Sequence, residues 1–163
     1  IYNMASGGFL GKDVTPANDR AVFGFLVYKT KSPVACQWAY IFDNILISAF
    51  TNGNFGYVFP SSSKSEGAVP SIYWEGVREG VKDYRYLKAL EKVMSQAKNA
   101  GKAKEEIEKV EKILEEIKEK VPIMSKGYDI MNGSKMETLE PRTYDIWRWN
   151  LADATMKIQE KLK

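Results

Sequence analysis

The chain has 163 residues, enough for one domain with a hydrophobic core, and its net charge of +3 comes from mixed runs of lysine and glutamate, which do not indicate a nucleic-acid partner. The lack of histidine and the single cysteine, Cys36, argue against a zinc site, a Cys-His nucleophile and an internal disulfide framework. No apolar run reaches about eighteen residues, so we predict no membrane span and no membrane partner.

The first part of the chain indicates a strand, a loop and a second apolar element. Residues 1–3 are predicted to end a strand, and a glycine-rich loop follows them. The apolar run at 21–29 has the length of a strand buried on both faces. A helix over 18–28 is the alternative, because residues 15–19 would begin such a helix well. Periodicity does not separate the two for so short a run.

Residues 34–42 form the best strand prediction, because small and large side chains alternate along them. Such alternation suits the inside of a barrel or a sheet covered by helices. Residues 57–59 are predicted to form a further short strand, and a polar loop follows at 60–67.

The segment 69–94 gives the strongest signal in the sequence. Pro70 and Ser71 suit a helix start, and Ser71 can cap free backbone N–H groups. Apolar residues then recur every three or four positions, as in an amphipathic helix: Trp74, Val77, Val81, Tyr84, Leu87 and Leu90. Gly76 and Gly80 interrupt this pattern, and each costs up to about 1 kcal/mol against alanine. We therefore expect another element to approach the helix backbone closely at these glycines.

Two more helices are predicted in the lysine-rich remainder. Gly101 is a plausible C-terminal cap for the long helix, and a second helix covers 103–121. That helix is interpreted as an outer helix packed on its neighbour, with a partner-binding coiled segment as the alternative. A last helix starts at Thr143 or Asp145 and ends near Leu162. Its predicted inward residues are Ile146, Trp147, Trp149, Leu151, Ala154, Ile158 and Leu162.

The stretch P-S-I-Y-W-E-G-V-R-E-G-V-K-D-Y-R-Y-L resembles the C-terminal end of the catalytic domain of family 123 glycoside hydrolases and the related domain of unknown function 4091. Those sequences carry a similar W-E-x-x-R-E-G-x-x-D-x-x-Y-L element on a helix late in a (β/α)8-like barrel. Tyr2-Asn3 resembles their "YN", and Arg20 with the following F-G-F and Y-K resembles their "R…GF..WK". Q-W-A-Y at 37–40 resembles "G..QWAY", although the glycine is not obvious. The resemblance covers residues 1–98.

This resemblance implies an α/β fold. Residues 1–98 would be the C-terminal portion of a (β/α)8-like barrel, its last two or three strands, and residues 99–163 a helical extension packed on it. It also implies a carbohydrate partner, with N-acetylhexosaminides as candidate substrates. The acetamido group of the sugar would attack, and a carboxylic acid would protonate the leaving oxygen.

The family assigns catalysis to an adjacent Asp-Glu pair on an earlier strand, and this sequence contains no such pair. The pair is therefore expected in a missing N-terminal part of the barrel, and hydrolysis by this chain alone is not expected. The start at Ile1, without an initiator methionine or a signal-peptide pattern, is interpreted as a cut inside a longer protein. A non-catalytic module that binds carbohydrate or a protein partner is the alternative function.

Barrel ligands bind at the C-terminal ends of strands, so the resemblance implies a set of substrate-binding residues at that face. Aromatic rings pack on sugar C–H faces, and amides and carboxylates bond to hydroxyls. The predicted set is Asn3, Lys29, Gln37, Trp38, Tyr40, Asp43, Trp74 and Glu75. Core packing is an equal alternative for Trp38 and Tyr40. We predict no catalytic residue, metal ligand or cofactor in this chain.

The charged residues of the long helix are better interpreted as structural. Arg78 is predicted to bridge Glu75 and Asp83, or to bind loop carbonyls, and so to lock the helix onto the barrel. Glu79 belongs to the same group of charges.

Overall fold

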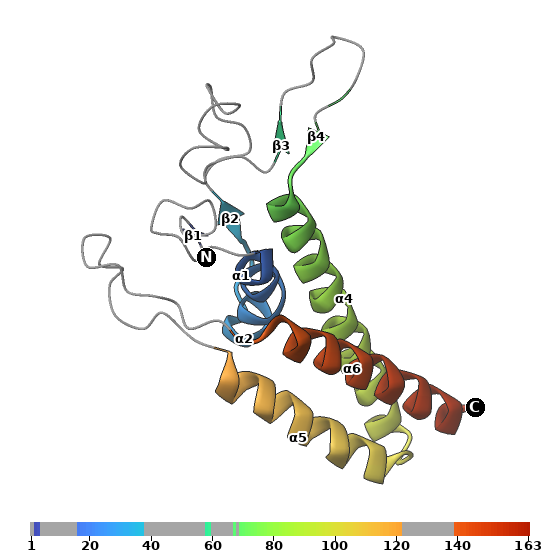
Figure 1. Cartoon of the computed structure of the whole chain (residues 1–163). Coiled ribbons are helices and arrows are strands. Elements are labelled where there is room, and N and C mark those ends of the chain that lie inside the picture. Colours follow the sequence, from blue (N-terminus) through green and yellow to red (C-terminus); the bar gives the residue numbers. More distant parts are fainter. Residues whose placement is uncertain (1, 4–15, 38–57, 60–66, 68, 122–138) are drawn as a thin grey trace.

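The computed structural model describes residues 2–3, 16–37, 58–59, 67, 69–121 and 139–163. These residues are mostly helical (Figure 1). The helices are α1 (Pro16–Arg20), the π-helical η1 (Ala21–Leu26), α2 (Val27–Thr30), α4 (Ile72–Asn99), α5 (Lys104–Lys120) and α6 (Pro141–Leu162). The strands, of two residues each, are β1 (Tyr2–Asn3), β2 (Cys36–Gln37), β3 (Val58–Phe59) and β4 (Val69–Pro70).

The strands form two small pairs. β1 runs parallel to β2, with Tyr2 opposite Cys36. β3 runs antiparallel to β4, with Val58 opposite Pro70. Within the described residues there is no barrel and no larger sheet, so the predicted barrel portion is wrong and the fold is mostly helical.

The apolar run at 21–29 shows why the barrel prediction failed. It continues α1 as the helices η1 and α2, not as a strand. Ala21, Val22, Phe25 and Leu26 are all buried. A helix that is buried on all sides is a continuous apolar run in the sequence. A strand that is buried on both faces is also a continuous apolar run, so the sequence pattern does not distinguish the two. Of the predicted strand at 34–42, residues 36–37 form β2 and residues 38–42 lie outside the described residues.

Both ends of α4 are formed as the sequence predicts. The Ser71 hydroxyl accepts a hydrogen bond from the Trp74 N–H at 3.4 Å. At the other end Gly101 has a φ of 66°. The N–H of Gly101 donates to the Lys98 carbonyl at 3.1 Å, and the N–H of the next residue donates to the Ala97 carbonyl at 2.9 Å. This is the Schellman arrangement, which satisfies the last carbonyls of the helix.

The glycines of α4 allow close packing against α1 and η1. A Cβ atom on Gly80 would lie 2.7 Å from the Arg20 carbonyl oxygen, and one on Gly76 would lie 2.3 Å from the Pro16 carbonyl oxygen. From the other side, a Cβ atom on Gly24 would lie 2.8 Å from the Gly80 carbonyl oxygen. The expectation of a close approach is confirmed, but the approaching element is a helix and not a sheet.

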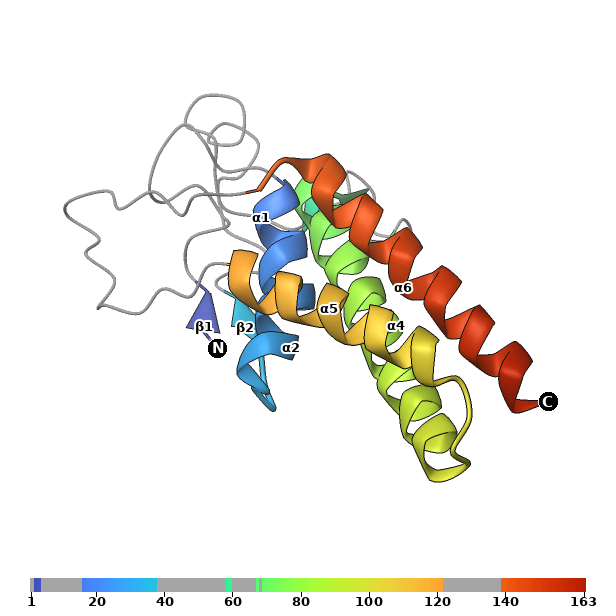
Figure 2. The ribbon, with the colours of Figure 1, turned by 90° about the horizontal axis from the view of Figure 1, so that it is seen from below.

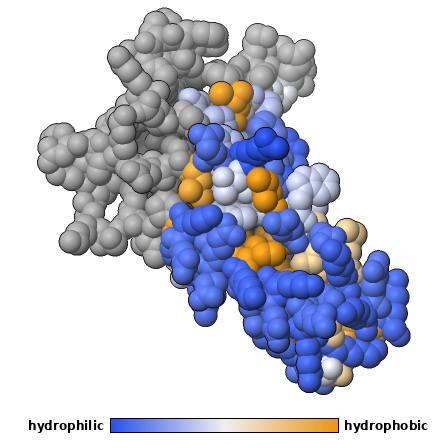
Figure 3. Space-filling view, turned by 60° about the horizontal axis from the view of Figure 1, so that its bottom comes forward, coloured by the Kyte–Doolittle hydropathy of each residue, from blue (hydrophilic) through white to orange (hydrophobic). Residues whose placement is uncertain are grey.

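The helix α6 crosses α4 and lies beside α5 (Figures 1 and 2). Its inner face adds Tyr144 and Trp147 to one core, where their rings lie 5.5 Å and 5.2 Å from that of Phe25. Ile146 and Trp149 were predicted to point inward, but they are 50% and 74% exposed. The visible surface of the described helices is mostly hydrophilic, with hydrophobic side chains in small groups (Figure 3).

Candidate functional site

Five charged side chains join α1, α4 and α6, and we call them the Asp83 ion cluster: Arg20, Glu79, Asp83, Asp145 and Arg148. Asp83 lies at its centre and is completely buried. The Arg20 Nε donates to Asp83 Oδ2 at 2.7 Å, and the Arg148 Nε donates to Asp83 Oδ1 at 2.5 Å. The two carboxylate oxygens of Asp83 thus hold one guanidinium from α1 and one from α6.

The other two acidic residues of the cluster accept further hydrogen bonds from the two arginines. Arg20 also donates to Asp145 at 2.6 Å. Arg148 contacts the Glu79 carboxylate and donates to the Glu79 carbonyl oxygen at 2.9 Å. The hydrogen bond from Lys82, joined by that from Arg148 and opposed by burial, lowers the pKa of Glu79 to about 2. Glu79 is therefore ionised at neutral pH and pairs with the Arg148 guanidinium, which suits a structural lock.

The predicted lock of the long helix onto a barrel is wrong; α4 is instead joined to α1 and α6, through Arg20 and Arg148. Arg78 pairs with Glu75 at 2.6 Å on the exposed side of α4, and Asp83 pairs instead with Arg20 and Arg148. Those partners are 63 and 65 residues away in the chain. Arg20 belongs to the "R…GF" resemblance and so had a signal in the sequence, whereas nothing in the sequence pointed to Arg148.

The structure places some of the predicted substrate-binding residues. Trp38, Tyr40 and Asp43 lie outside the described residues. Asn3 and Gln37 face each other in the β1–β2 pair, and only their backbone positions are described.

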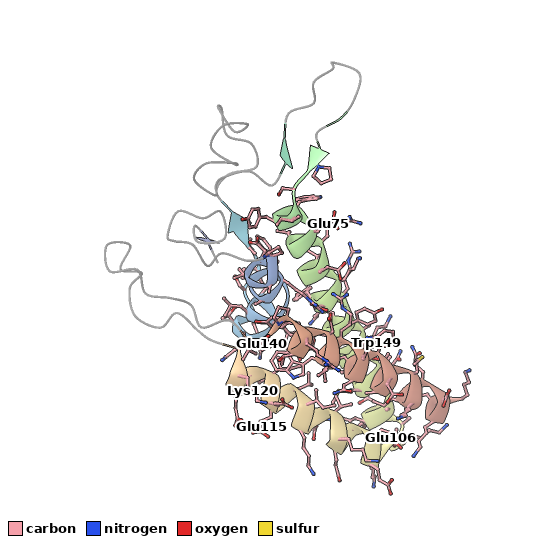
Figure 4. All side chains as sticks on the ribbon, viewed as in Figure 1. Glu75, Glu106, Glu115, Lys120, Glu140 and Trp149 are labelled. Atoms are coloured by element: carbon pink, nitrogen blue, oxygen red, sulfur yellow. The ribbon has the colours of Figure 1, made fainter. Side chains whose placement is uncertain are left out.

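The other three residues of that set lie on helices. Lys29 donates to the Val121 carbonyl oxygen at 2.5 Å and so joins α2 to the end of α5. Trp74 and Glu75 lie in the first turn of α4. Figure 4 labels Glu75 at that end of the helix. A substrate role for the whole set stays a prediction.

A groove with a volume of about 590 Å³ lies between α2, α4 and α5. We call it the α4–α5 groove. Its apolar members are Tyr28, Met94 and Leu114, and all three are buried. Its polar members are Glu91, Ser95, Lys98, Asn99, Glu111, Glu115 and Lys118. Sequence reasoning missed this groove because α2 is distant in the chain from α4 and α5, and the packing of the three helices is not visible in the sequence.

A hydrogen bond fixes the buried end of this groove. Burial and the hydrogen bond to Glu91 raise the pKa of Tyr28, so its hydroxyl stays protonated and donates to that carboxylate. Burial acts against ionisation of Glu91, but the hydrogen bonds from Lys88 and Tyr28 lower the pKa of Glu91. Further along the groove, Lys98 and Glu111 form an ion pair at 2.7 Å between α4 and α5.

Within the described residues, no group of three or more acidic, cysteine or histidine side chains could hold a metal ion. No helix in the same part of the chain is long and apolar enough to cross a membrane. No family model matches the sequence, and no curated protein or solved structure matches the chain.

Proposed function

We propose that this chain is the C-terminal part of a carbohydrate-active, glycoside hydrolase-like enzyme whose catalytic Asp-Glu pair lies outside this chain. In this proposal its helices are a structural support for the catalytic part, and N-acetylhexosaminides are the candidate substrates.

One observation carries the proposal. The "R…GF" stretch and the "R-E-G-x-x-D" stretch resemble the same family separately, and they are in direct contact. Arg20 of the first bonds to Asp83 of the second at 2.7 Å, and Gly24 of the first packs on Gly80 of the second. If the chain is related to this family, a junction between the two helices would explain why both stretches resemble it. A junction of this kind supports a mechanism through rigidity, not through contact with substrate.

The test compares this chain with the longer product encoded by the DNA that precedes and includes it. We expect the longer product to release p-nitrophenol from aryl N-acetylhexosaminides, and this chain alone to release none. Changing the upstream Asp-Glu pair to Asn-Gln should abolish the activity of the longer product without unfolding it. A start codon directly before Ile1, or a folded longer product that is inactive on the whole panel, would contradict the proposal.

A further inference from the structure

We propose that the α4–α5 groove is a non-catalytic binding site for a neutral saccharide. The choice of a saccharide rests on the function proposed above, while the choice of a neutral ligand rests on the groove itself. Its volume of about 590 Å³ lies within the roughly 300–1,000 Å³ that is usual for ligand pockets.

The floor of the groove is apolar, and each of its three side chains is partly accessible from the groove. Tyr28 comes from α2, Met94 from α4 and Leu114 from α5, so the floor joins three helices. All three side chains belong to the hydrophobic core, which holds them in place. Sugar rings present C–H groups on one face, and these pack on apolar and aromatic side chains.

The rim of the groove disfavours ions of either sign. Three carboxylates line it, from Glu91, Glu111 and Glu115, beside two ammonium groups, from Lys98 and Lys118. An anion would lie next to the carboxylates, and a cation would lie next to the ammonium groups. A sugar hydroxyl both donates and accepts hydrogen bonds, so it can pair with either kind of group.

The groove is also arranged before any ligand arrives. The Tyr28–Glu91 hydrogen bond holds the carboxylate of Glu91, and the exposed Lys98–Glu111 ion pair links α4 to α5. Ser95 and Asn99 add a hydroxyl and an amide from one wall. Groups held in place lose little conformational freedom when a ligand binds, which favours affinity.

A second groove provides a matched control. It lies between α5 and α6, has a volume of about 380 Å³ and is lined by charged residues and by Val110, Ile113 and Ala154. It has no aromatic residue in its lining, and Asn150 lies on its α6 wall.

The experiment is an NMR titration of the ¹⁵N-labelled chain with chitotriose and maltotriose, and separately with spermidine and inorganic phosphate. We expect saturable shifts of amide signals within 91–99 and 111–118 for a neutral saccharide only. Ser95→Trp should fill the groove and weaken binding at least about tenfold, and Asn150→Trp should leave binding unchanged. Glu115→Trp, on the α5 wall (Figure 4), repeats the test if Ser95→Trp does not fold.

Absence of shifts with both saccharides, or equal binding by the groove-filling and control variants, would overturn the proposal. Shifts of the same amides by phosphate or spermidine would overturn the neutral-ligand assignment. The titration needs no catalytic pair, so its failure would leave the activity test of the longer product unaffected.

Discussion

Asp83 is the residue on which the junction between α1, α4 and α6 depends. It is completely buried and bonds to the guanidinium groups of Arg20 and Arg148. Asp83→Ala would leave two partly buried cations without their shared partner. Removing one member of a buried ion pair costs about 3–5 kcal/mol, so we expect a loss of that size in the free energy of unfolding. Urea denaturation followed by circular dichroism measures it.

Glu75→Gln is the control for that variant. The Glu75–Arg78 pair lies on the exposed side of the same helix. Exposed pairs contribute roughly 0–1 kcal/mol, so the change should be small. If both variants lost the same free energy of unfolding, the burial of the Asp83 ion pairs would not be the source of the stabilisation.

Lys31 has an unfavourable backbone conformation. Its φ is 51°, in the left-handed region, and its side chain is exposed at the end of α2. A residue with a Cβ atom costs roughly 1–2 kcal/mol there, whereas glycine does not. We expect Lys31→Gly to raise the midpoint of thermal unfolding and Lys31→Ala to leave it unchanged. A rise with both variants would point to the loss of the lysine charge instead.

At the scale of elements, the packing of α4 on α1 and η1 depends on Gly80. In an exposed helix, replacing glycine by alanine stabilises by about 1 kcal/mol. Here the new methyl group would lie 2.7 Å from the Arg20 carbonyl and 3.0 Å from the Gly24 nitrogen, both backbone atoms. Overpacking of this kind costs about 1–3 kcal/mol, so Gly80→Ala should destabilise the protein in chemical denaturation.

Gly67→Ala is the comparison, because, apart from the chain neighbours of Gly67, no atom of the described residues lies within 4 Å of the added methyl group. We expect a change within about 0.5 kcal/mol. Stabilisation by Gly80→Ala would mean that the two helices are not in close contact.

The helices α4, α5 and α6 could be predicted because their signals are local. Ser71, Gly101 and the apolar spacing act within a few residues of each helix. The run at 21–29 could not be assigned, because only its packing against α4 shows which of its faces are buried. Trp149 was misplaced because it is large and apolar, although it lies two residues from the buried Trp147 and Leu151 and therefore on another side of the helix. Contacts such as Arg148–Asp83 depend on a chain separation of 65 residues, which no local pattern encodes.

At the scale of the whole molecule, a hydrophobic core and the Asp83 ion cluster hold the described helices together. The core takes Phe25 from η1, Leu87 from α4, Val110 from α5 and Trp147 from α6. The Asp83 ion cluster adds directional contacts between α1, α4 and α6, which apolar packing alone does not provide. Cores specify burial, whereas paired charges also specify which surfaces face each other.

The ion pairs also determine how the stability of the molecule should depend on pH. The pKa of Glu79 is lowered from 4.5 to about 2, chiefly by Lys82 and then by Arg148. The pKa of Glu91 is lowered as well: burial raises it, but hydrogen bonds from Lys88 and Tyr28 together outweigh burial. The pKa of Glu116 is lowered chiefly by the hydrogen bond from Lys120, which is larger than the opposing effect of burial. A carboxyl group with a lower pKa in the folded state binds protons better when unfolded, so acid favours unfolding.

The stability that these groups contribute is therefore fully present above their unfolded pKa of about 4.5 and is lost as the pH falls below it; for Glu79 the loss extends down to about pH 2. We expect the urea midpoint to be nearly constant between about pH 5 and 7 and to fall steeply below that range. Glu79→Gln should lower the midpoint at neutral pH and make the fall shallower, because one of the shifted groups is gone. Glu75→Gln, which removes an exposed carboxylate paired with Arg78, provides the control for the loss of one negative charge. A midpoint that does not change down to pH 3 would contradict the assignment of these pairs to the folded state.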